Sequence, residues 1–333
     1  MTCSFAYAGV YTAAMDALAG VLTGPRARGA FLLRAVMSPP WSVRVRDEAP
    51  LSLVAMVREQ AWLVPDDADP VPVRPGDVAI LRGPAPYTFA DDPTTAPQVV
   101  IHPGGRCRTP DGRDVAQEMD LGVRTWGNDP NGPVVMLIGT YQLHGEVSRR
   151  LLDVLPGHLV LSGEDAPDRL RALVTLLGDE VVTDEPGQEV VLDRLLDLLL
   201  VAVLRTWFAH SGRAPAWYRA YSDPVIGPAV RMLHHHPARP WTVASLAAQV
   251  GVSRASLARR FTELLGEPPM SFLTRWRLDL AADLLRDGDL TLDAVARRVG
   301  YGSGFALSAA FKRVHGVSPQ QYRAGRPRPG AAA

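Results

Sequence analysis

The sequence contains little cysteine, no long apolar run and no excess of charge of either sign. Two cysteines among 333 residues, Cys3 and Cys107, are too few for a disulfide framework and are typical of a reducing cytoplasm. The longest strongly apolar stretch, Leu198 to Leu204, is much shorter than the roughly 20 residues of a membrane-spanning helix. The N-terminus also lacks the basic start and compact apolar run of a secretory signal. These absences predict a cytoplasmic protein with no membrane association.

The balanced charge, 35 basic against 35 acidic residues, conceals an asymmetry along the chain. From Asp223 to the end there are 15 basic and 8 acidic residues, a net charge of +7. The preceding residues carry 20 basic and 27 acidic side chains, a net charge of −7. This division predicts that the C-terminal part binds a polyanion, with a chance distribution of surface charge as the alternative.

Short apolar runs separated by turn residues fill the chain from about Phe31 to Leu161. The intervening segments are rich in Pro, Gly, Asp and Asn, which suit tight turns. Many short strands at this spacing predict an antiparallel sandwich or barrel. The strands are predicted at FLLRAVM, LSLVAMV, DVAIL, PQVVIH and PVVMLIGTY.

Helical periodicity replaces the strand pattern after residue 163. Asp168–Leu177 and Glu189–Trp207 are predicted helices, and Pro186-Gly187 separates them. The second helix is apolar around most of its circumference, which favours packing against the partner chain of a homodimer. Deep burial within one chain is the alternative. Residues 209–224 are predicted to form a linker.

One structural unit occurs twice in the C-terminal part. Gly251 recurs as Gly300, 49 residues later, and Phe261 recurs as Phe311, 50 residues later. A slip of one residue inside a turn, with both flanks kept, indicates a duplicated unit.

Each copy predicts two short helices joined by a tight turn. In the first copy Thr242 caps one helix, Gly251 ends it in the left-handed conformation, and Ser253 caps the next. This arrangement is a helix-turn-helix, predicted at 243–264 and again at 292–315. In DNA-binding proteins the second helix of such a unit lies in the major groove.

Helical geometry selects the residues that face DNA. Leu257, Phe261 and Leu264 form the buried side, and Arg259 lies almost diametrically opposite. Arg259 is therefore predicted to contact a guanine, whereas Arg254 and the other flanking arginine are predicted to contact phosphates. A solvated helix face is the alternative. The predicted DNA-binding residues are Arg254, Ala255, Ser256, Arg259 and Arg260 in the first unit, and Ser303, Phe305, Lys312 and Arg313 in the second.

The second copy has Ala309 at the position equivalent to Arg259. Base reading is therefore expected in the first unit. The second unit is expected to add affinity, because Lys312 and Arg313 can reach phosphates and its outer face can contact thymine methyl groups. A long helix that starts after the prolines at 268–269 is predicted to fix the spacing of the two recognition helices.

These residues resemble the C-terminal DNA-binding domain of the AraC/XylS family of transcription regulators. The resemblance covers roughly Asp223 to Arg323 and includes the closing pattern GYGSGFALSAAFKRVHGVSPQQYR. It implies two helix-turn-helix units joined by a long helix, binding to double-stranded promoter DNA, and RNA polymerase as a partner in activation. Relatives commonly have an acidic residue at the position of Gly304 and an arginine at that of Ala309.

The N-terminal part resembles the cupin-type sensor domain of one branch of the same family, over about Ala17 to Trp207. Among the supporting stretches are VPVRPGDVAILRGPAPYTF and PGQEVVLDRLLDLLLVAVLRTW. The resemblance implies a small barrel followed by dimerising helices. The predicted fold is α+β and multidomain. An N-terminal antiparallel β cupin-like barrel is predicted in 1–163, followed by a helical linker and dimerisation region in 164–222. A C-terminal all-α double helix-turn-helix domain is predicted in 223–325, and a disordered tail in 326–333.

A metal-dependent cupin enzyme with an appended regulatory module is the main alternative function. Cupin enzymes hold a metal with a His-x-His pair, a carboxylate and a further histidine. The corresponding region, LVAMVREQAW, contains no histidine, and Tyr87 stands where a later ligand is expected. No metal or other cofactor is therefore predicted, and the chain is not expected to be an enzyme. A protein–protein adaptor that has lost DNA binding is a further alternative, motivated by Gly304 and Ala309.

The predicted effector is a small molecule or an oxidant that acts on the barrel. Arg106 and Arg108 flank Cys107, and neighbouring cations lower a thiol pKa. Cys107 is therefore a candidate redox sensor, with His102 nearby; an ordinary loop cysteine is the alternative.

Four aromatic residues are candidates for the wall of an apolar effector pocket, with ordinary core packing as the alternative. They are Trp62, Tyr87, Phe89 and Trp126. The three histidines at 234–236 are instead predicted to form a solvated helix end, because neighbours on a helix point about 100° apart and cannot converge on one metal ion.

Overall fold

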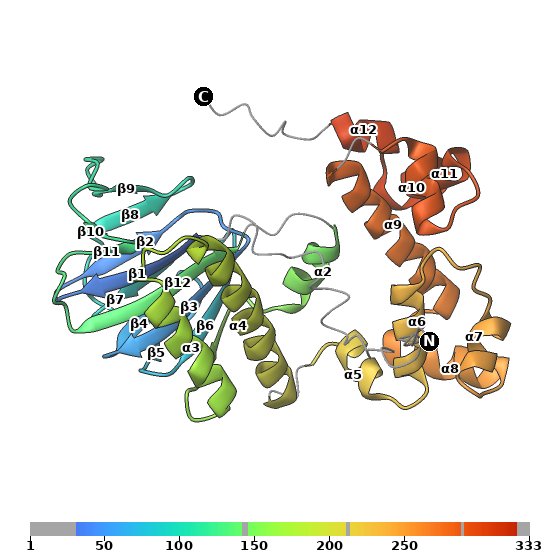
Figure 1. Cartoon of the computed structure of the whole chain (residues 1–333), viewed down its shortest axis with the longest axis horizontal. Helices are drawn as coiled ribbons and strands as arrows, with labels where there is room; N and C mark the ends of the chain where they lie inside the picture. Colours follow the sequence, from blue (N-terminus) through green and yellow to red (C-terminus); the bar gives the residue numbers. More distant parts are fainter. Residues whose placement is uncertain (1–30, 142–145, 211–213, 288–289, 325–333) are drawn as a thin grey trace, which may run out of the picture. The chain divides into compact units, whose positions relative to one another are not determined.

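The structure is a computed structural model that describes residues 31–141, 146–210, 214–287 and 290–324. Contacts divide the described chain into two compact units (Figure 1). The N-terminal unit contains 31–141 and 148–210, and the C-terminal unit contains 146–147, 214–287 and 290–324. Cys3 and the tail predicted at 326–333 lie outside the described residues, and the predicted domain boundaries stay predictions.

Two β-sheets face each other in the N-terminal unit and enclose its hydrophobic core. The strand order is β10-β11-β1-β12-β3-β6-β13 in the first sheet and β5-β4-β7-β2-β8-β9 in the second. The strands of the first sheet are β1 (Phe31–Met37), β3 (Leu51–Arg58), β6 (Val78–Arg82), β10 (Asp120–Gly122), β11 (Thr125–Gly127), β12 (Val134–Tyr141) and β13 (His158–Leu161). Those of the second are β2 (Ser42–Val45), β4 (Ala61–Pro65), β5 (Val71–Val73), β7 (Tyr87–Ala90), β8 (Val99–His102) and β9 (Arg106–Arg108).

All five strands predicted from the sequence are present, and most neighbouring strands are antiparallel. Two pairings differ from the prediction, because β1 pairs with β11 and β2 with β8 in parallel. Neither pair is consecutive in the sequence, and only a direct hairpin connection requires the antiparallel direction.

Strand β12 is buried on both faces, which explains its continuous apolar run. Helices α3 (Asp168–Glu180) and α4 (Gln188–His210) lie side by side over one face of its sheet (Figure 1). On that face the Tyr141 hydroxyl donates to the Leu196 carbonyl at 2.8 Å. A Cβ at Gly139 would lie 2.6 Å from a Leu196 methyl carbon, so glycine permits the close approach of α4. The alternate residues of β12 face the second sheet.

The helical predictions for the N-terminal unit were largely confirmed. Helix α3 begins at the predicted residue and α4 begins one residue earlier. The helix α2 (Glu146–Val154) was not predicted. Part of the predicted linker is also helical, since α5 (Ala216–Ser222) lies within it. None of the described helices is long and apolar enough to cross a membrane.

The C-terminal unit is all-α over its described residues, as predicted. After α5 it contains α6 (Ile226–His235), α7 (Val243–Gln249), α8 (Arg254–Leu265), α9 (Pro269–Asp287), α10 (Leu292–Val299), α11 (Gly304–His315) and α12 (Pro319–Ala324).

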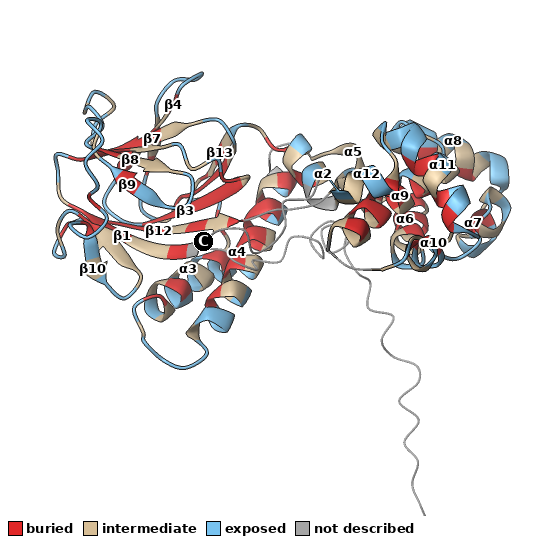
Figure 2. Ribbon diagram, turned by 90° about the horizontal axis from the view of Figure 1, so that it is seen from above, coloured by how far each residue is buried: buried red, intermediate tan, exposed pale blue. Residues whose placement is uncertain are grey.

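Helix α9 joins two separate hydrophobic cores of the C-terminal unit. Phe272, in its first half, packs in a core with Leu257 and Phe261 of the first helix-turn-helix. Leu285, in its second half, packs in another core with Phe311 of the second. In Figure 2 the ribbons of these helices carry both buried (red) and exposed (pale blue) residues. Because one continuous helix contributes to both cores, it constrains the distance between the two helix-turn-helix units, as the sequence predicted.

Candidate DNA-binding surface and effector cavity

The capping residues predicted in the first helix-turn-helix occupy their expected places. Thr242 Oγ1 accepts from the Ser245 N–H at 3.0 Å, and Ser245 Oγ accepts from the Thr242 N–H at 2.9 Å. Gly251 has a φ of 72°, which other residues rarely adopt. Ser253 Oγ then accepts from the Ser256 N–H at 3.2 Å and begins α8.

The exposed face of α8 is the one predicted from its periodicity. Leu257 and Phe261 are completely buried, whereas the Arg259 side chain is 72% exposed. Arg259 makes one ion pair, with Glu263 at 3.4 Å, and such an exposed pair contributes little to stability. The guanidinium of Arg259 therefore remains accessible to a ligand. Arg254 and Ala255 are exposed on this helix and Ser256 is half-buried.

Arg260 has an intramolecular partner. Its guanidinium nitrogens donate to Asp223 Oδ2 at 3.0 and 2.7 Å. The other oxygen of Asp223 accepts from the backbone N–H groups of Val225 and Ile226 at the start of α6, both at 2.9 Å. Arg260 thus ties α8 to α6, which makes it a weaker candidate for phosphate contact than Arg254.

The second helix-turn-helix repeats the caps but presents different side chains. Ser303 Oγ accepts from the Ala306 N–H at 3.2 Å, and Asp293 Oδ1 accepts from the Gly304 N–H at 2.7 Å. A Cβ at Gly304 would lie 2.9 Å from that carboxylate oxygen, so the position has little room for a side chain. Phe305 is 86% exposed on the outer face of α11. Ala306, Ala309, Lys312 and Arg313 are also exposed on this helix.

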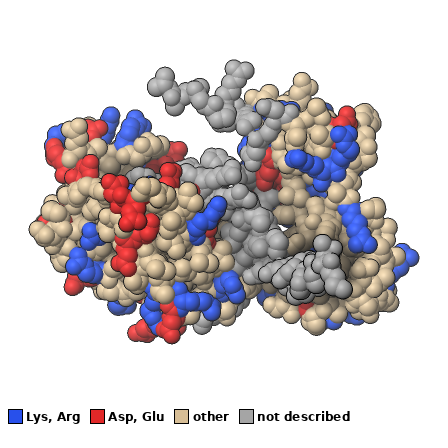
Figure 3. All heavy atoms as spheres, viewed as in Figure 1, with Lys and Arg blue, Asp and Glu red and all other residues tan. Residues whose placement is uncertain are grey.

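Helices α8 and α11 lie along the same side of the C-terminal unit, one toward each end (Figures 1 and 2). On the face drawn in Figure 3, Lys and Arg side chains are prominent on this unit. The acidic side chains in that view gather mainly on the N-terminal unit. The charge division predicted from the sequence is therefore visible on this face.

The prediction of a solvated histidine run was wrong for His234. Its Nδ1 shares a hydrogen bond with the Tyr221 hydroxyl. The ring centroid lies 5.3 Å from that of Phe272 and 4.3 Å from that of Trp276. His235 and His236 are exposed, as predicted. The difference arises because consecutive helical residues point about 100° apart, so His234 can face the core while its two neighbours face solvent.

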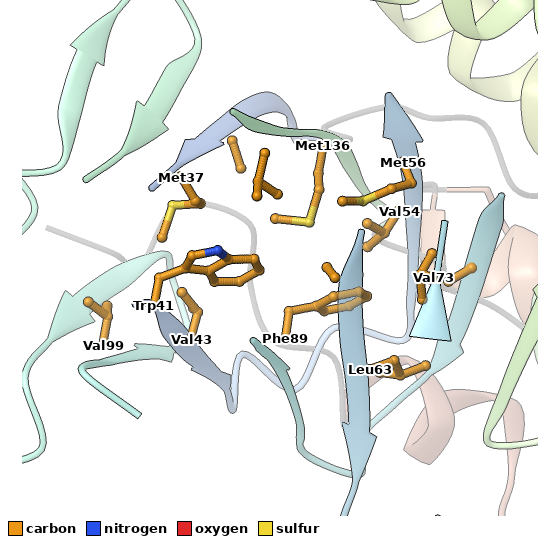
Figure 4. Close-up of a cluster of buried hydrophobic side chains, with 14 of the residues drawn as sticks. Met37, Trp41, Val43, Val54, Met56, Leu63, Val73, Phe89, Val99 and Met136 are labelled. Atoms are coloured by element: carbon orange, nitrogen blue, oxygen red, sulfur yellow. The ribbon is translucent and has the colours of Figure 1, made fainter. Parts of the chain in front are cut away.

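A cavity of about 460 Å³ lies between the two sheets of the N-terminal unit. Its wall consists of the inward-facing alternate residues of strands in both sheets, together with residues of the connecting loops. Figure 4 shows part of this wall, where Met37, Met136 and Phe89 surround the indole ring of Trp41. The lining residues are Leu33, Ala35, Met37, Trp41, Val43, Val45, Asp47, Ala49, Val54, Tyr87, Phe89, Ile101, Gly104, Gly105, Cys107, Trp126, Met136, Ile138 and Thr140.

Polar groups are few in the cavity wall. Asp47 is the only charged residue that the described part of the chain contributes to it, and its carboxylate accepts from the Ala49 N–H at 3.1 Å. Burial raises the pKa of Tyr87 well above its usual value, Ser52 opposes this with a hydrogen bond, and the charge of Asp47 raises it further. Tyr87 is therefore neutral at physiological pH. The cavity suits a largely apolar molecule.

The prediction that neighbouring arginines lower the pKa of Cys107 was wrong. Burial raises the pKa of this thiol and the charge of Asp114 raises it further, while the Trp126 N–H lowers it. Cys107 faces inward on β9 and is 8% exposed, whereas Arg106 and Arg108 point outward on the same strand. Alternation along the strand thus separates the thiol from the two cations.

The structure brings some predicted effector residues together and separates others. Tyr87, Phe89, Cys107 and Trp126 line the cavity, whereas Trp62 and His102 do not. Trp41, which lies deep in the wall, was not predicted. The apolar residues that alternate along β1, just before Trp41, could have indicated one wall of the cavity. Among the described residues, no cluster of three or more His, Cys, Asp or Glu side chains could hold a metal ion, and the lining contains no histidine.

Comparisons with known proteins agree with this architecture. Residues 16–209 match a cupin family, and residues 246–325 match a helix-turn-helix domain. A Streptomyces lividans protein named as an AraC-like transcription regulator is 35% identical over 93% of this chain and 98% of its own length. The transcriptional regulator AlkR of Acinetobacter baylyi is 34% identical over 52% of this chain and 58% of its own length.

Among solved structures, the DNA-binding domain of AdpA in complex with a target DNA is 37% identical to this chain. The match covers 31% of this chain and 92% of the AdpA chain, with a TM-score of 0.30. The cupin match spans more than half of the chain, and the Streptomyces relative is aligned over nearly all of it. The chain therefore belongs to the AraC family of DNA-binding transcription regulators and carries a cupin domain ahead of its helix-turn-helix domain.

Proposed function

We propose that the chain is a sequence-specific regulator whose DNA affinity changes when a small molecule occupies the cupin cavity. The observation that carries the proposal is the combination of an outward guanidinium at Arg259 with an apolar cavity of about 460 Å³ in the other unit. Such a cavity lies within the range of roughly 300–1,000 Å³ typical of small-molecule sites.

Arg259 reads a base, and the flanking cations hold the phosphates. The accessible guanidinium of Arg259 can donate two hydrogen bonds to a guanine edge in the major groove. Arg254, Lys312 and Arg313 supply phosphate contacts. Phe305 offers an exposed ring to a thymine methyl group from the second unit. Ala255, Ser256 and Ser303 complete the surface next to these contacts.

The DNA proposal is tested with the purified full-length chain and its own upstream DNA. Arg259→Ala is expected to lose about 1–3 kcal/mol of binding free energy and to relax specificity at one base pair. Lys312→Ala is expected to weaken binding to all sequences alike and to reduce the salt slope by about 1. Arg113→Ala, an exposed arginine of the N-terminal unit, is the matched control. Unchanged promoter binding by Arg259→Ala would favour the adaptor alternative.

The raised pKa of Cys107 favours a small-molecule effector over an oxidant, because the reactive thiolate is scarce in a buried site. The effector proposal is tested with a reporter gene placed behind the upstream DNA. Ala35→Leu adds carbon atoms at the cavity wall, while Val182→Leu alters an exposed site of the same unit. The filled cavity should change reporter output or its response to growth conditions, and the control should not.

Dimerisation through α4 completes the proposal. Val190, Val191 and Leu198 on this helix are 62%, 43% and 51% exposed, although they are apolar. A second copy that covers them would present two DNA-binding domains to paired half-sites. Leu198→Glu is expected to shift the mass measured by sedimentation equilibrium from dimer to monomer. RNA polymerase is the expected partner at an activated promoter.

A further inference from the structure

We propose that the cavity binds a neutral, largely apolar molecule with a hydrogen-bond acceptor, such as a carbonyl oxygen or a ring nitrogen, and that the Trp41 indole N–H donates to this acceptor. The inference rests on the proposed effector function and adds the chemical class of the ligand. Its basis is that the cavity wall contains two indole N–H donors and one carboxylate. A purely apolar ligand would have no use for these polar groups.

Trp41 has a buried donor that no protein group satisfies. Its side chain is 1% exposed, and its Nε1 has no hydrogen-bond partner among the residues that the structure describes. Nearly all buried donors in proteins have a partner, because an unpaired one loses its bond to water without replacement. The indole ring lies beside Met37 and Met136 (Figure 4), whose sulfur atoms are weak acceptors. The Trp41 N–H therefore lacks a strong acceptor, and a ligand in the cavity would supply one.

Trp126 provides a second donor in the same wall. Its Nε1 is buried and likewise has no regular hydrogen-bond partner within the described part of the chain. The nearby Cys107 sulfur, whose pKa this N–H lowers, is a weak acceptor. Trp126 lies on β11 of the first sheet, and Trp41 immediately precedes β2 of the second. Two tryptophans, one in a strand of the first sheet and the other directly before a strand of the second, thus line one largely apolar cavity.

The charges in the wall argue for a neutral ligand. Of the residues that the structure describes, Asp47 is the single charged one in the lining, and no Lys, Arg or His accompanies it. A ligand anion would be repelled by this carboxylate and would find no cation to pair with. A ligand cation would find a single carboxylate, that of Asp47, among the described residues of this wall. Asp47 also already accepts from the Ala49 N–H.

Ordered water is the competing hydrogen-bond partner of the two indole N–H groups. A buried water usually makes about three hydrogen bonds and therefore needs several polar neighbours. Apart from Trp41, Trp126, Asp47, Tyr87, Cys107 and Thr140, the side chains of the wall are aliphatic, phenyl or thioether, and two glycines complete it. A space of about 460 Å³ with this lining favours an organic molecule that carries its own acceptor.

The test compares two probes of nearly the same shape, benzophenone and diphenylmethane, which differ by one carbonyl oxygen. Equilibrium dialysis against the full-length chain gives both dissociation constants for the wild type, Trp41→Phe and Trp126→Phe. Phenylalanine keeps an aromatic ring and removes the N–H. Trp41→Phe is expected to weaken benzophenone binding about threefold to tenfold, as the loss of one hydrogen bond does, and to leave diphenylmethane binding within about twofold.

Trp62→Phe is the matched control, because Trp62 lies outside the cavity lining and should change neither constant. If Trp41→Phe fails to fold, a second measurement on the wild type decides. The Trp41 indole N–H proton resonance should then move downfield with benzophenone and not with diphenylmethane.

Equal effects of Trp41→Phe on both probes would overturn the proposal, as would no binding of either probe. Tighter binding of diphenylacetate or of a benzhydryl ammonium ion than of benzophenone would also overturn it, since the ligand would then be charged. These measurements contain no DNA. A failure here removes the ligand class alone, whereas an unchanged reporter in the Ala35→Leu strain removes the effector function.

Discussion

The carboxylate of Asp293, on the first helix of the second helix-turn-helix, accepts a hydrogen bond at 2.7 Å from the backbone N–H of Gly304, at the start of the recognition helix. The two residues belong to different helices, so this contact joins them across the turn. It also places negative charge at a helix N-terminus, where such charge is favourable.

Replacing Asp293 by alanine should therefore destabilise the C-terminal unit. The Gly304 N–H would lose its acceptor, and the expected loss is about 1 kcal/mol, as for other helix caps. Asp293→Asn retains an acceptor oxygen and should lose less than half as much. Thermal unfolding of the full-length chain, followed by circular dichroism, measures both. Equal stability of the wild type and the alanine variant would show that the contact contributes nothing.

Acid should weaken the link between α6 and α8. Burial raises the pKa of Asp223, but the N–H groups of Ile226 and Val225 and the Arg260 guanidinium outweigh this and lower it. A carboxyl with a lowered pKa stabilises the fold above its unfolded value of about 3.9 and loses that effect as the pH falls through the folded value.

The wild type is therefore expected to lose more stability than Asp223→Asn between pH 5 and pH 3. Urea unfolding at several pH values measures the difference. Other carboxylates titrate in both proteins, so only the change in slope between them is informative. Parallel pH dependences would contradict the assignment.

The Cys107 thiol should react slowly in the native protein. Its raised pKa reduces the thiolate fraction at pH 7, and its burial restricts access. In a Cys3→Ser background, iodoacetamide should alkylate Cys107 at least about tenfold more slowly in buffer than in urea, where the thiol regains an ordinary pKa. Similar rates in the two solutions, followed by mass spectrometry, would restore Cys107 as a redox candidate.

Two phenylalanines of α11 should separate DNA binding from folding. Phe305 is 86% exposed, so Phe305→Ala should change the free energy of unfolding by less than about 0.5 kcal/mol while lowering DNA affinity several-fold. Phe311 is fully buried, and Phe311→Ala should lower stability by about 3–5 kcal/mol. Fluorescence anisotropy with labelled upstream DNA and urea unfolding give the two quantities. A stable Phe305→Ala protein with wild-type affinity would remove this residue from the DNA surface.

The helix-turn-helix units could be predicted in detail because their determinants are local. The caps at Thr242 and Ser253 act on backbone groups three residues away, and the left-handed Gly251 lies between them. The exposed position of Arg259 follows from helical periodicity alone. What that surface reads on DNA remains a prediction.

Contacts between distant residues could not be predicted in this way. Arg260 was expected to face phosphate, but its partner Asp223 lies 37 residues earlier in the chain. The two parallel strand pairings likewise join segments that are far apart in sequence. Local patterns carry no information on which of many possible partners a residue meets in the folded state.

By itself the sequence determined five of the strands, the helices α3 and α4, the duplicated helix-turn-helix and the outward face of its first recognition helix. Each depends on a periodicity or a cap that acts over a few residues. Only the tertiary structure decided that Trp41, Tyr87, Cys107 and Trp126 share one cavity and that the thiol pKa rises. The physical reason is that a cavity wall and its desolvation are produced when two sheets pack together, and that packing brings together strands which are distant along the chain.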